Sequence, residues 1–224
     1  LEQMRDRFDI VHSQDCISAR AAARIRDAGA PFRLVRTVHH VDDFTTEALI
    51  ECQRQAILEP DHVLVVSKLW QDNLRVDYGV EADIVTNGVW PDNFRCKLDA
   101  DRQRELRRKV GAEDRFLFLT IGGIEPRKGS MFLVEALAKL KASRRVAPVL
   151  AIIGGHSFQD YSAYREEVIA ALPGLGLELE RDVIQLRTVA QSELVEWLAV
   201  ADSFVFPSVN EGWGLVIMEA ASAG

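Results

Sequence analysis

The sequence has few of the features that mark membrane, disulfide-rich or zinc-binding proteins. Its three cysteines, Cys16, Cys52 and Cys96, show no C-x-x-C or Cys/His spacing, so neither a disulfide framework nor a zinc site is predicted. Free thiols in a reducing cytosol are the simplest interpretation, and we expect a cytoplasmic protein. No stretch approaches the roughly 20 apolar residues of a membrane-spanning helix. Residues 1–5 do not resemble the start of a signal peptide.

An excess of positive charge is also absent. The 224 residues include 27 Lys and Arg against 34 Asp and Glu, a net charge of −7, which argues against a protein that binds nucleic acid through phosphate contacts. Any anionic ligand must therefore be bound by a local group of positive charges. The sequence contains no G-x-G-x-x-G dinucleotide fingerprint and no internal repeat.

What the sequence does contain is an alternation of strands and helices, which predicts parallel sheets. Two alternating blocks meet near residues 88–100, so we predict domains 1–92 and 93–224, with Ser67 and Ser192 as helix caps. The chain starts without a glycine-rich first strand and ends directly after a helix, and we expect both domains to be incomplete. The predicted strands are 8–13, 34–40, 62–67, 84–85, 116–121, 148–153, 183–186 and 203–206, and the predicted helices are 18–28, 45–58, 68–78, 101–110, 130–141, 161–172, 193–199 and 215–223.

Two glutamates flank a glycine-containing turn near the end of the chain. If a helix begins near Gly214, Glu211 lies in the loop before it and Glu219 about one turn inside it. The backbone N–H groups of Gly214, Leu215 and Val216 would then be unpaired and able to bind a phosphate. A glutamate can accept two ribose hydroxyls. A favourable helix-dipole position explains one of these glutamates but not both, so the pattern favours a sugar-nucleotide site.

A second motif, which is basic, lies after the predicted strand 116–121. Arg127 and Lys128 follow this strand and precede a helix, which places them at the carboxyl edge of a parallel sheet, where open α/β folds bind ligands. Lys128 is suited to bind a diphosphate as a point charge. The alternative interpretation is a solvated pair at a loop tip.

These segments resemble a known family. The residues from Glu211 to Ala220 resemble the E-x7-E motif of retaining glycosyltransferases of family four. Other segments match the family in the same order and extend the resemblance over essentially the whole chain: Val38-His39, Val66-Ser67 with Thr86-Asn87-Gly88-Val89, and residues 121–129, which resemble its donor-phosphate loop. The resemblance implies an α/β protein of the GT-B fold, with two Rossmann-like domains facing a central cleft.

The resemblance also implies a reaction and its residues. A hexosyl group would pass from a nucleotide-diphosphate sugar to an acceptor hydroxyl with retained configuration. His39 and Glu211 would line the sugar as catalytic residues, and Glu219 would hold the ribose. Further donor contacts would come from Arg127, Lys128, Gly212, Gly214, Leu215, Val216 and, in the loop that faces the base, Val189. Gly123 stands where the family usually has an arginine, and two alternatives follow: Arg127 compensates as the second cation, or phosphate binding is weaker.

Neither a metal nor a cofactor is expected beside the sugar nucleotide. Asp99 and Asp101 have the Asp-x-Asp spacing of metal-dependent glycosyltransferases, but this segment follows no strand and precedes a basic helix, and capping of that helix is the better interpretation. The sequence does not identify the acceptor, which is a saccharide, a lipid or a small molecule. It also leaves open whether the protein makes peripheral contact with a membrane. Two alternatives are a GT-B sugar-nucleotide epimerase and a chain that binds nucleotide sugars without turnover.

Overall fold

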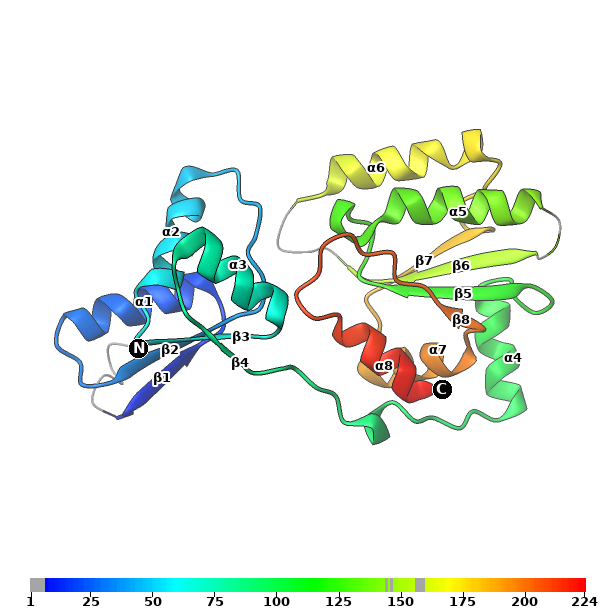
Figure 1. Ribbon diagram of the computed structural model, residues 1–224. Helices are drawn as coiled ribbons and strands as arrows, with labels where there is room; N and C mark the ends of the chain where they lie inside the picture. The colour runs from blue at the N-terminus through cyan, green and yellow to red at the C-terminus, as the bar shows by residue number, and fades with distance from the viewer. Residues whose placement is uncertain (1–6, 144, 146, 156–159) are drawn as a thin grey trace. The chain divides into compact units, whose positions relative to one another are not determined.

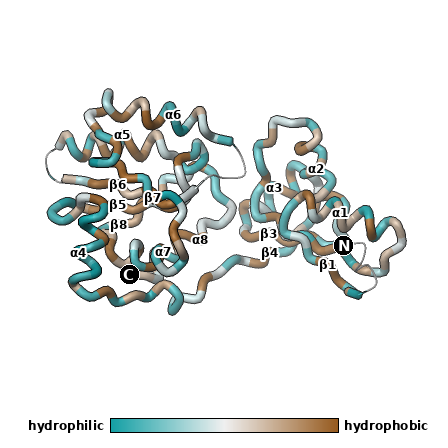
Figure 2. Tube along the Cα trace, turned by 180° about the vertical axis from the view of Figure 1, so that it is seen from behind, coloured by the Kyte–Doolittle hydropathy of each residue, from teal (hydrophilic) through white to brown (hydrophobic). Residues whose placement is uncertain are grey.

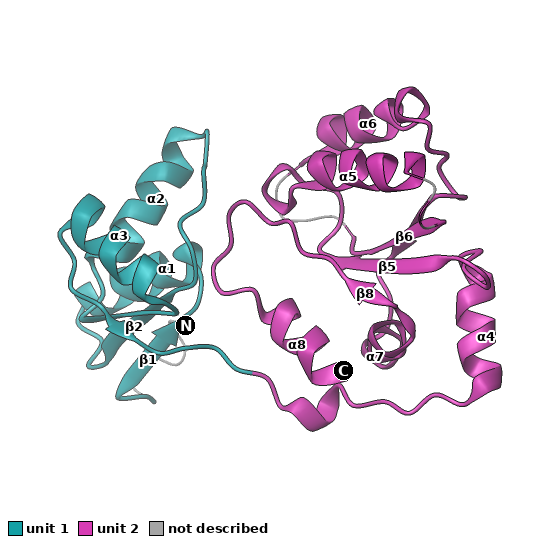
Figure 3. Cartoon of the chain, turned by 45° about the vertical axis from the view of Figure 1, so that its right-hand side comes forward, with its two compact units in different colours: residues 1–88 teal, residues 89–224 magenta. Residues whose placement is uncertain are grey.

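Two compact units make up the protein. The computed structural model describes residues 7–143, 145, 147–155 and 160–224. Contacts divide the chain into unit 1, residues 1–88, and unit 2, residues 89–224 (Figure 3). The division predicted from the sequence, after residue 92, lies in the short 3-10 helix η2 (Pro91–Asn93). Each unit is built on its own parallel sheet (Figure 1).

In the part of the chain that the structure describes, unit 1 has a four-stranded sheet in the order β1-β2-β3-β4. Its elements are β1 (Ile10–Ser13), α1 (Cys16–Asp27), β2 (Arg33–Val38), α2 (Glu47–Leu58), β3 (His62–Val65), α3 (Lys68–Tyr78) and β4 (Asp83–Ile84). The predicted cap Ser67 begins α3 by accepting a hydrogen bond from Trp70 N at 3.4 Å. Because all pairs are parallel, the carboxyl ends of β1 and β2 lie at one edge of the sheet.

The described residues of unit 2 form a second four-stranded parallel sheet, in the order β7-β6-β5-β8. Its elements are α4 (Ala100–Lys109), β5 (Phe116–Ile121), η3 (Pro126–Lys128), α5 (Ser130–Ala142), β6 (Pro148–Ile153), α6 (Ser162–Ala171), η4 (Pro173–Leu175), β7 (Val183–Arg187), α7 (Gln191–Val200), β8 (Ser203–Phe204) and α8 (Leu215–Ala223). Helices α5 and α6 cover one face of this sheet, and α4, α7 and α8 lie on the other (Figure 1). The Asp-x-Asp segment caps α4, and the capping residue is Asp99, which accepts a hydrogen bond from Arg102 N at 2.8 Å.

The strands β5 and β6 of unit 2 are mainly hydrophobic (Figure 2), as expected for strands that are covered on both faces of a parallel sheet. Every residue of β6 is buried. Alternate side chains of this strand point to opposite faces, so Ala151 packs with Trp197 of α7 on one face, whereas Leu150 packs with Val134 of α5 on the other.

Helices and strands begin and end within about two residues of their predicted positions, and three details were wrong. The strand predicted to reach His40 ends at Val38, because its last ladder partner is Val65. Ser192 does not cap α7: the helix begins at Gln191, after an extended Ala190 with no side-chain cap. The strand expected to reach residue 206 ends at Phe204, where its pairing with β5 stops.

At the amino end of the unit 2 sheet, Asp182 connects the start of β7 to α5 and to the residue before β5. Its carboxylate is 2% exposed and accepts hydrogen bonds from Arg115 at 2.7 Å and Lys141 at 2.8 Å. Burial raises the pKa of Asp182, but bonds from Lys141, the Glu178 amide, Arg115 and Arg181 outweigh it and lower the pKa to about 2. An unfolded aspartate titrates near pH ~3.9. The ionised carboxylate therefore stabilises the fold above that pH, and this stabilisation is lost as the pH falls through about 2.

We predict that Asp182→Asn lowers the free energy of unfolding at pH 7 by about 2–4 kcal/mol, because the partly buried Arg115 and Lys141 lose the buried counter-charge that they meet. Urea denaturation should show this loss, and the difference from the wild type should shrink between pH 4 and pH 2. Glu178→Gln is the matched control, since its exposed ion pair with Arg181 contributes at most about 1 kcal/mol. Equal losses in the two variants would contradict the assignment.

Candidate functional site

Two loops of unit 2 meet at the carboxyl edge of its sheet. One follows β5 and carries Arg127 and Lys128, and the other follows β8 and leads to Glu211. Val209 N donates a hydrogen bond to Arg127 O at 2.9 Å, which joins the loops. Gly129 allows the approach, because a Cβ there would lie 2.3 Å from Pro207 O.

The joined loops bring Lys128 and Glu211 into contact. Lys128 Nζ donates to Glu211 Oε2 at 2.6 Å and lies 5.0 Å from the centre of the Phe206 ring. Ser208 Oγ donates to the same carboxylate oxygen at 3.2 Å. Burial raises the pKa of Glu211, but Lys128, Arg127 and Ser208 together outweigh burial and lower it. Glu211 is therefore ionised at neutral pH beside a half-buried cation.

Arg127 supplies a second positive charge. Its Nη1 lies 3.7 Å from Glu211 Oε1. Its Nε lies 3.0 Å from Oε2 of the buried Glu125, and these two atoms form an ion pair whose angles are not those of a hydrogen bond. Gly123 has φ +75°, and a Cβ there would lie 3.0 Å from Gly155 O. This crowded left-handed backbone disfavours an arginine at position 123, so Arg127 is the cation beside Lys128.

The N-terminus of α8 faces the ligand edge without a capping side chain. Gly214 precedes the helix with φ +78°, which agrees with the predicted start. Ile217 N bonds to Gly214 O at 2.9 Å, whereas the N–H groups of Gly214, Leu215 and Val216 have no acceptor among the described residues. Such a helix end can bind an anion through its amides and its dipole.

Glu219 lies one turn inside α8. It is half-buried and has no hydrogen-bond or ion-pair partner in the described part of the chain. Burial raises the pKa of its carboxyl, and no partner offsets that effect. A carboxyl whose ionisation is disfavoured by burial is typical of a functional site. Its two oxygens can accept hydrogen bonds from hydroxyl groups.

The other predicted site residues have different surroundings. His39 belongs to unit 1, just beyond β2, where its Nε2 lies 2.8 Å from Gln14 Oε1. Val189 is half-buried and packs against the core of unit 2, and Gly212 is half-buried in the loop before α8. The sequence motifs missed Phe206 and Ser208, although both follow β8 at the edge where ligands bind.

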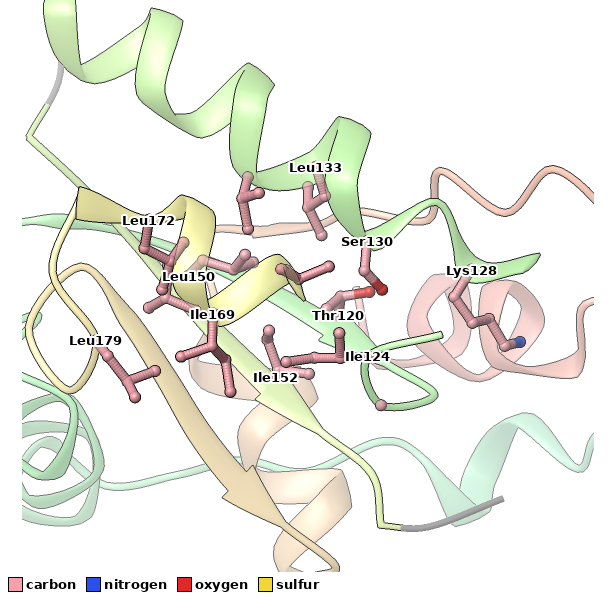
Figure 4. A pocket seen from close by; sticks show the side chains of 14 residues that line it. Thr120, Ile124, Lys128, Ser130, Leu133, Leu150, Ile152, Ile169, Leu172 and Leu179 are labelled. Carbon is pink, nitrogen blue, oxygen red and sulfur yellow. The ribbon is translucent and has the colours of Figure 1, made fainter. Parts of the chain in front are cut away.

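An internal cavity of about 10 Å³ lies between α5, α6 and the sheet. Its lining is mainly aliphatic, and Lys128 stands at one end with its amino group directed away (Figure 4). This volume is comparable with that of one water molecule. The cavity is therefore a packing gap, and the candidate site is the open sheet edge beside Lys128.

Two further findings concern metal and membrane features, and both are limited to the described residues. No group of three or more His, Cys, Asp or Glu side chains is placed to hold a metal ion. No helix is long and apolar enough to cross a membrane.

Comparisons with known sequences match both units to glycosyltransferases. Residues 102–224 match the family described as Glycosyl transferases group 1, and residues 1–93 match Glycosyltransferase Family 4. An uncharacterized glycosyltransferase of Methanocaldococcus jannaschii is 25% identical over 98% of this chain and 56% of its own length. The D-inositol 3-phosphate glycosyltransferase of Jonesia denitrificans is 30% identical over 97% of this chain and 54% of its own. The chain thus spans about half the length of such relatives.

Solved structures show the same fold. Anabaena Alr3699/HepE, in a crystal structure with UDP-glucose, aligns with a TM-score of 0.83 at 21% identity, over 99% of this chain and 59% of that one. Sucrose-phosphate synthase of Thermosynechococcus elongatus aligns with a TM-score of 0.75 at 21% identity, over 95% of this chain and 53% of that one. The prediction of two GT-B-type α/β domains is confirmed.

The loop junction gives a testable prediction. Gly129→Ala should cost clearly more stability than the ~1–2 kcal/mol of placing alanine in the left-handed region, because its Cβ also meets Pro207 O. Gly176→Ala is the matched control, since Gly176 has a similar φ of +71° but a Cβ added there would have no atom within 4 Å. Urea denaturation compares the two variants. Equal losses would show that the loops are not held at this contact.

Proposed function

Because this chain belongs to the group 1 glycosyl transferases, we propose that it transfers a hexosyl group from a nucleotide-diphosphate sugar to an acceptor hydroxyl with retention of configuration. The observation that carries the proposal is the convergence at one sheet edge of Lys128, Arg127 and the open N-terminus of α8, with Glu219 unpartnered nearby on α8. The UDP-glucose complex of the structurally similar HepE supports a nucleotide-sugar donor.

In this proposal the diphosphate binds beside Lys128. An ammonium group has three N–H donors, and one of them reaches Glu211, so the others can bind phosphate oxygens without breaking that bond. Arg127 and the amides of Leu215 and Val216 add to the positive potential. These groups stabilise the charge that develops on the leaving diphosphate, and the proposal assigns no metal or further cofactor to this step.

The rest of the donor lies along the same edge. Glu219 accepts the two ribose hydroxyls, and Gly212 and Gly214 let the backbone approach the phosphates closely. The base lies toward the loop after β7, where Val189 contributes its backbone. In unit 2, Glu211, already ionised, is assigned the orientation of the transferred sugar. In unit 1, His39 is assigned a contact with a sugar hydroxyl.

Transfer then proceeds by front-face substitution. The bond between the anomeric carbon and the diphosphate oxygen breaks as the acceptor oxygen bonds to that carbon from the same face. The proton of the acceptor hydroxyl passes to the departing diphosphate. Because one relative is a D-inositol 3-phosphate glycosyltransferase, a cyclic polyol phosphate is the first acceptor to assay. Saccharides and lipids are assayed beside it.

The donor site predicts that Lys128→Ala weakens UDP binding about tenfold or more, since hydrogen bonds to charged groups contribute about 1.5–3 kcal/mol. Isothermal titration calorimetry with a panel of nucleoside diphosphates measures this effect and identifies the base. Lys139→Ala is the control, because Lys139 is exposed on α5.

Unchanged affinity in Lys128→Ala would overturn the donor-site assignment. Nucleotide binding with transfer and donor hydrolysis at background would instead favour a chain that binds nucleotide sugars without turnover. Product analysis with and without acceptor separates transfer from epimerisation.

A second prediction concerns Glu219, whose folded pKa is raised by burial. Ionisation then costs stability at neutral pH: the cost is absent below the ordinary glutamate pKa and complete above the raised value. Glu219→Gln should therefore increase the free energy of unfolding at pH 7 while it weakens UDP binding about tenfold. Urea denaturation and calorimetry measure the two effects, with the exposed Glu135→Gln on α5 as control. A variant that loses stability, or keeps full affinity, would contradict the role.

A further inference from the structure

In unit 1, side chains at the carboxyl ends of β1 and β2 form a hydrogen-bonded chain that includes His39. His12 Nε2 lies 2.7 Å from Thr37 Oγ1 and 3.0 Å from Gln14 Nε2. Gln14 Oε1 in turn lies 2.8 Å from His39 Nε2. The parallel register of β1 and β2 brings these residues, 25 apart in sequence, to one edge.

The amide of Gln14 determines where the imidazole protons lie. An amide nitrogen donates and an amide oxygen accepts. His12 Nε2 therefore carries a lone pair, which the Gln14 amide and the Thr37 hydroxyl share as donors, so the His12 proton is on Nδ1. His39 must donate from Nε2 to Gln14 Oε1. Its Nδ1 is left with a lone pair and has no hydrogen-bond partner among the described residues.

The surroundings keep His39 neutral. Burial lowers its pKa, and the positive charge of Arg36 lowers it further. Arg36 is 7% exposed, and its Nε and Nη1 have no hydrogen-bond partner in the described residues. The nearby carboxylate of Asp42 lies 3.1 Å from His40 Nε2. An imidazole in this field is uncharged at pH 7.

We propose that Gln14 is a positioning residue that holds His39 as the Nε2–H tautomer, so that Nδ1 accepts a hydrogen bond from a hydroxyl of the transferred sugar. The sugar contact rests on the proposed function, whereas the tautomer does not. An imidazolium has no lone pair to accept with. His39 thus recognises a neutral polyol, and the site weakens when His39 is protonated.

The tautomer can be measured directly. Long-range ¹H–¹⁵N correlation spectra of the 224-residue chain, with His39 assigned through His39→Asn, report which ring nitrogen carries the proton and how it titrates. We expect Nε2–H in the wild type at pH 7. Gln14→Leu, of similar size but without an acceptor, should give a mixture of tautomers. Gln14→Glu should raise the pKa of His39, because a carboxylate favours the imidazolium.

Matched controls come from Gln103, whose exposed amide donates to Leu98 O at 3.0 Å in unit 2. Gln103→Leu and Gln103→Glu should leave the tautomer and titration of His39 unchanged. An Nδ1–H tautomer in the wild type, which the opposite orientation of the Gln14 amide would produce, overturns the proposal. So does a tautomer that survives Gln14→Leu.

Kinetics test the second half of the proposal. Gln14→Leu should lower kcat for sugar transfer about tenfold, since misoriented groups at a reacting centre are costly, and leave UDP affinity unchanged. The acid limb of the pH–rate profile should move to higher pH in Gln14→Glu. Wild-type transfer rates in a Gln14→Leu variant that has lost its tautomer would refute positioning. If the wild type binds no nucleotide, the proposed function fails, and the spectra still decide the tautomer.

Discussion

A backbone contact underlies the candidate site in unit 2. Val209 N bonds to Arg127 O, and Gly129 lies against Pro207 O with no room for a side chain. These contacts fix the distance between the loops that follow β5 and β8. The 2.6 Å bond from Lys128 to Glu211 is a consequence, because it needs both side chains to start from loops already held together. An ion pair between free loops would lose much of its energy to side-chain ordering.

Several polar groups without partners lie in the places to which function is assigned. The amides at the start of α8 and the carboxyl of Glu219 are unpaired among the described residues, while the buried network around Asp182, at the opposite end of the sheet, is fully bonded. In unit 1, the buried guanidinium of Arg36, whose charge acts on His39, has unsatisfied Nε and Nη1. Unsatisfied polar groups reduce stability. Their retention at ligand edges is what a site prepared for a polar ligand requires.

The fold could be predicted from the sequence because its signals are local and agree with one another. The apolar runs of β5 and β6, the cap at Ser67 and the glycine before α8 each specify a boundary. The site could be predicted only in part. Strand ends placed Lys128 and Glu211 at one edge, but their direct bond depends on how the loops approach, which no residue spacing encodes. The role of Gln14 depends on a parallel register between segments 25 residues apart, and a single glutamine carries no such signal.

The two proposed ligand sites differ in their electrostatics. Unit 2 gathers two cations and helix amides around ionised Glu211, which suits the doubly charged diphosphate of the proposed donor. Unit 1 lowers the pKa of His39 and fixes its proton through an uncharged amide. A sugar carries no charge, and discrimination among its hydroxyls needs a donor or an acceptor of fixed identity rather than a strong field. A mobile or protonated imidazole would offer no such discrimination, so the neutral chain from Thr37 to His39 is as specific a feature of the protein as the ion pair in unit 2.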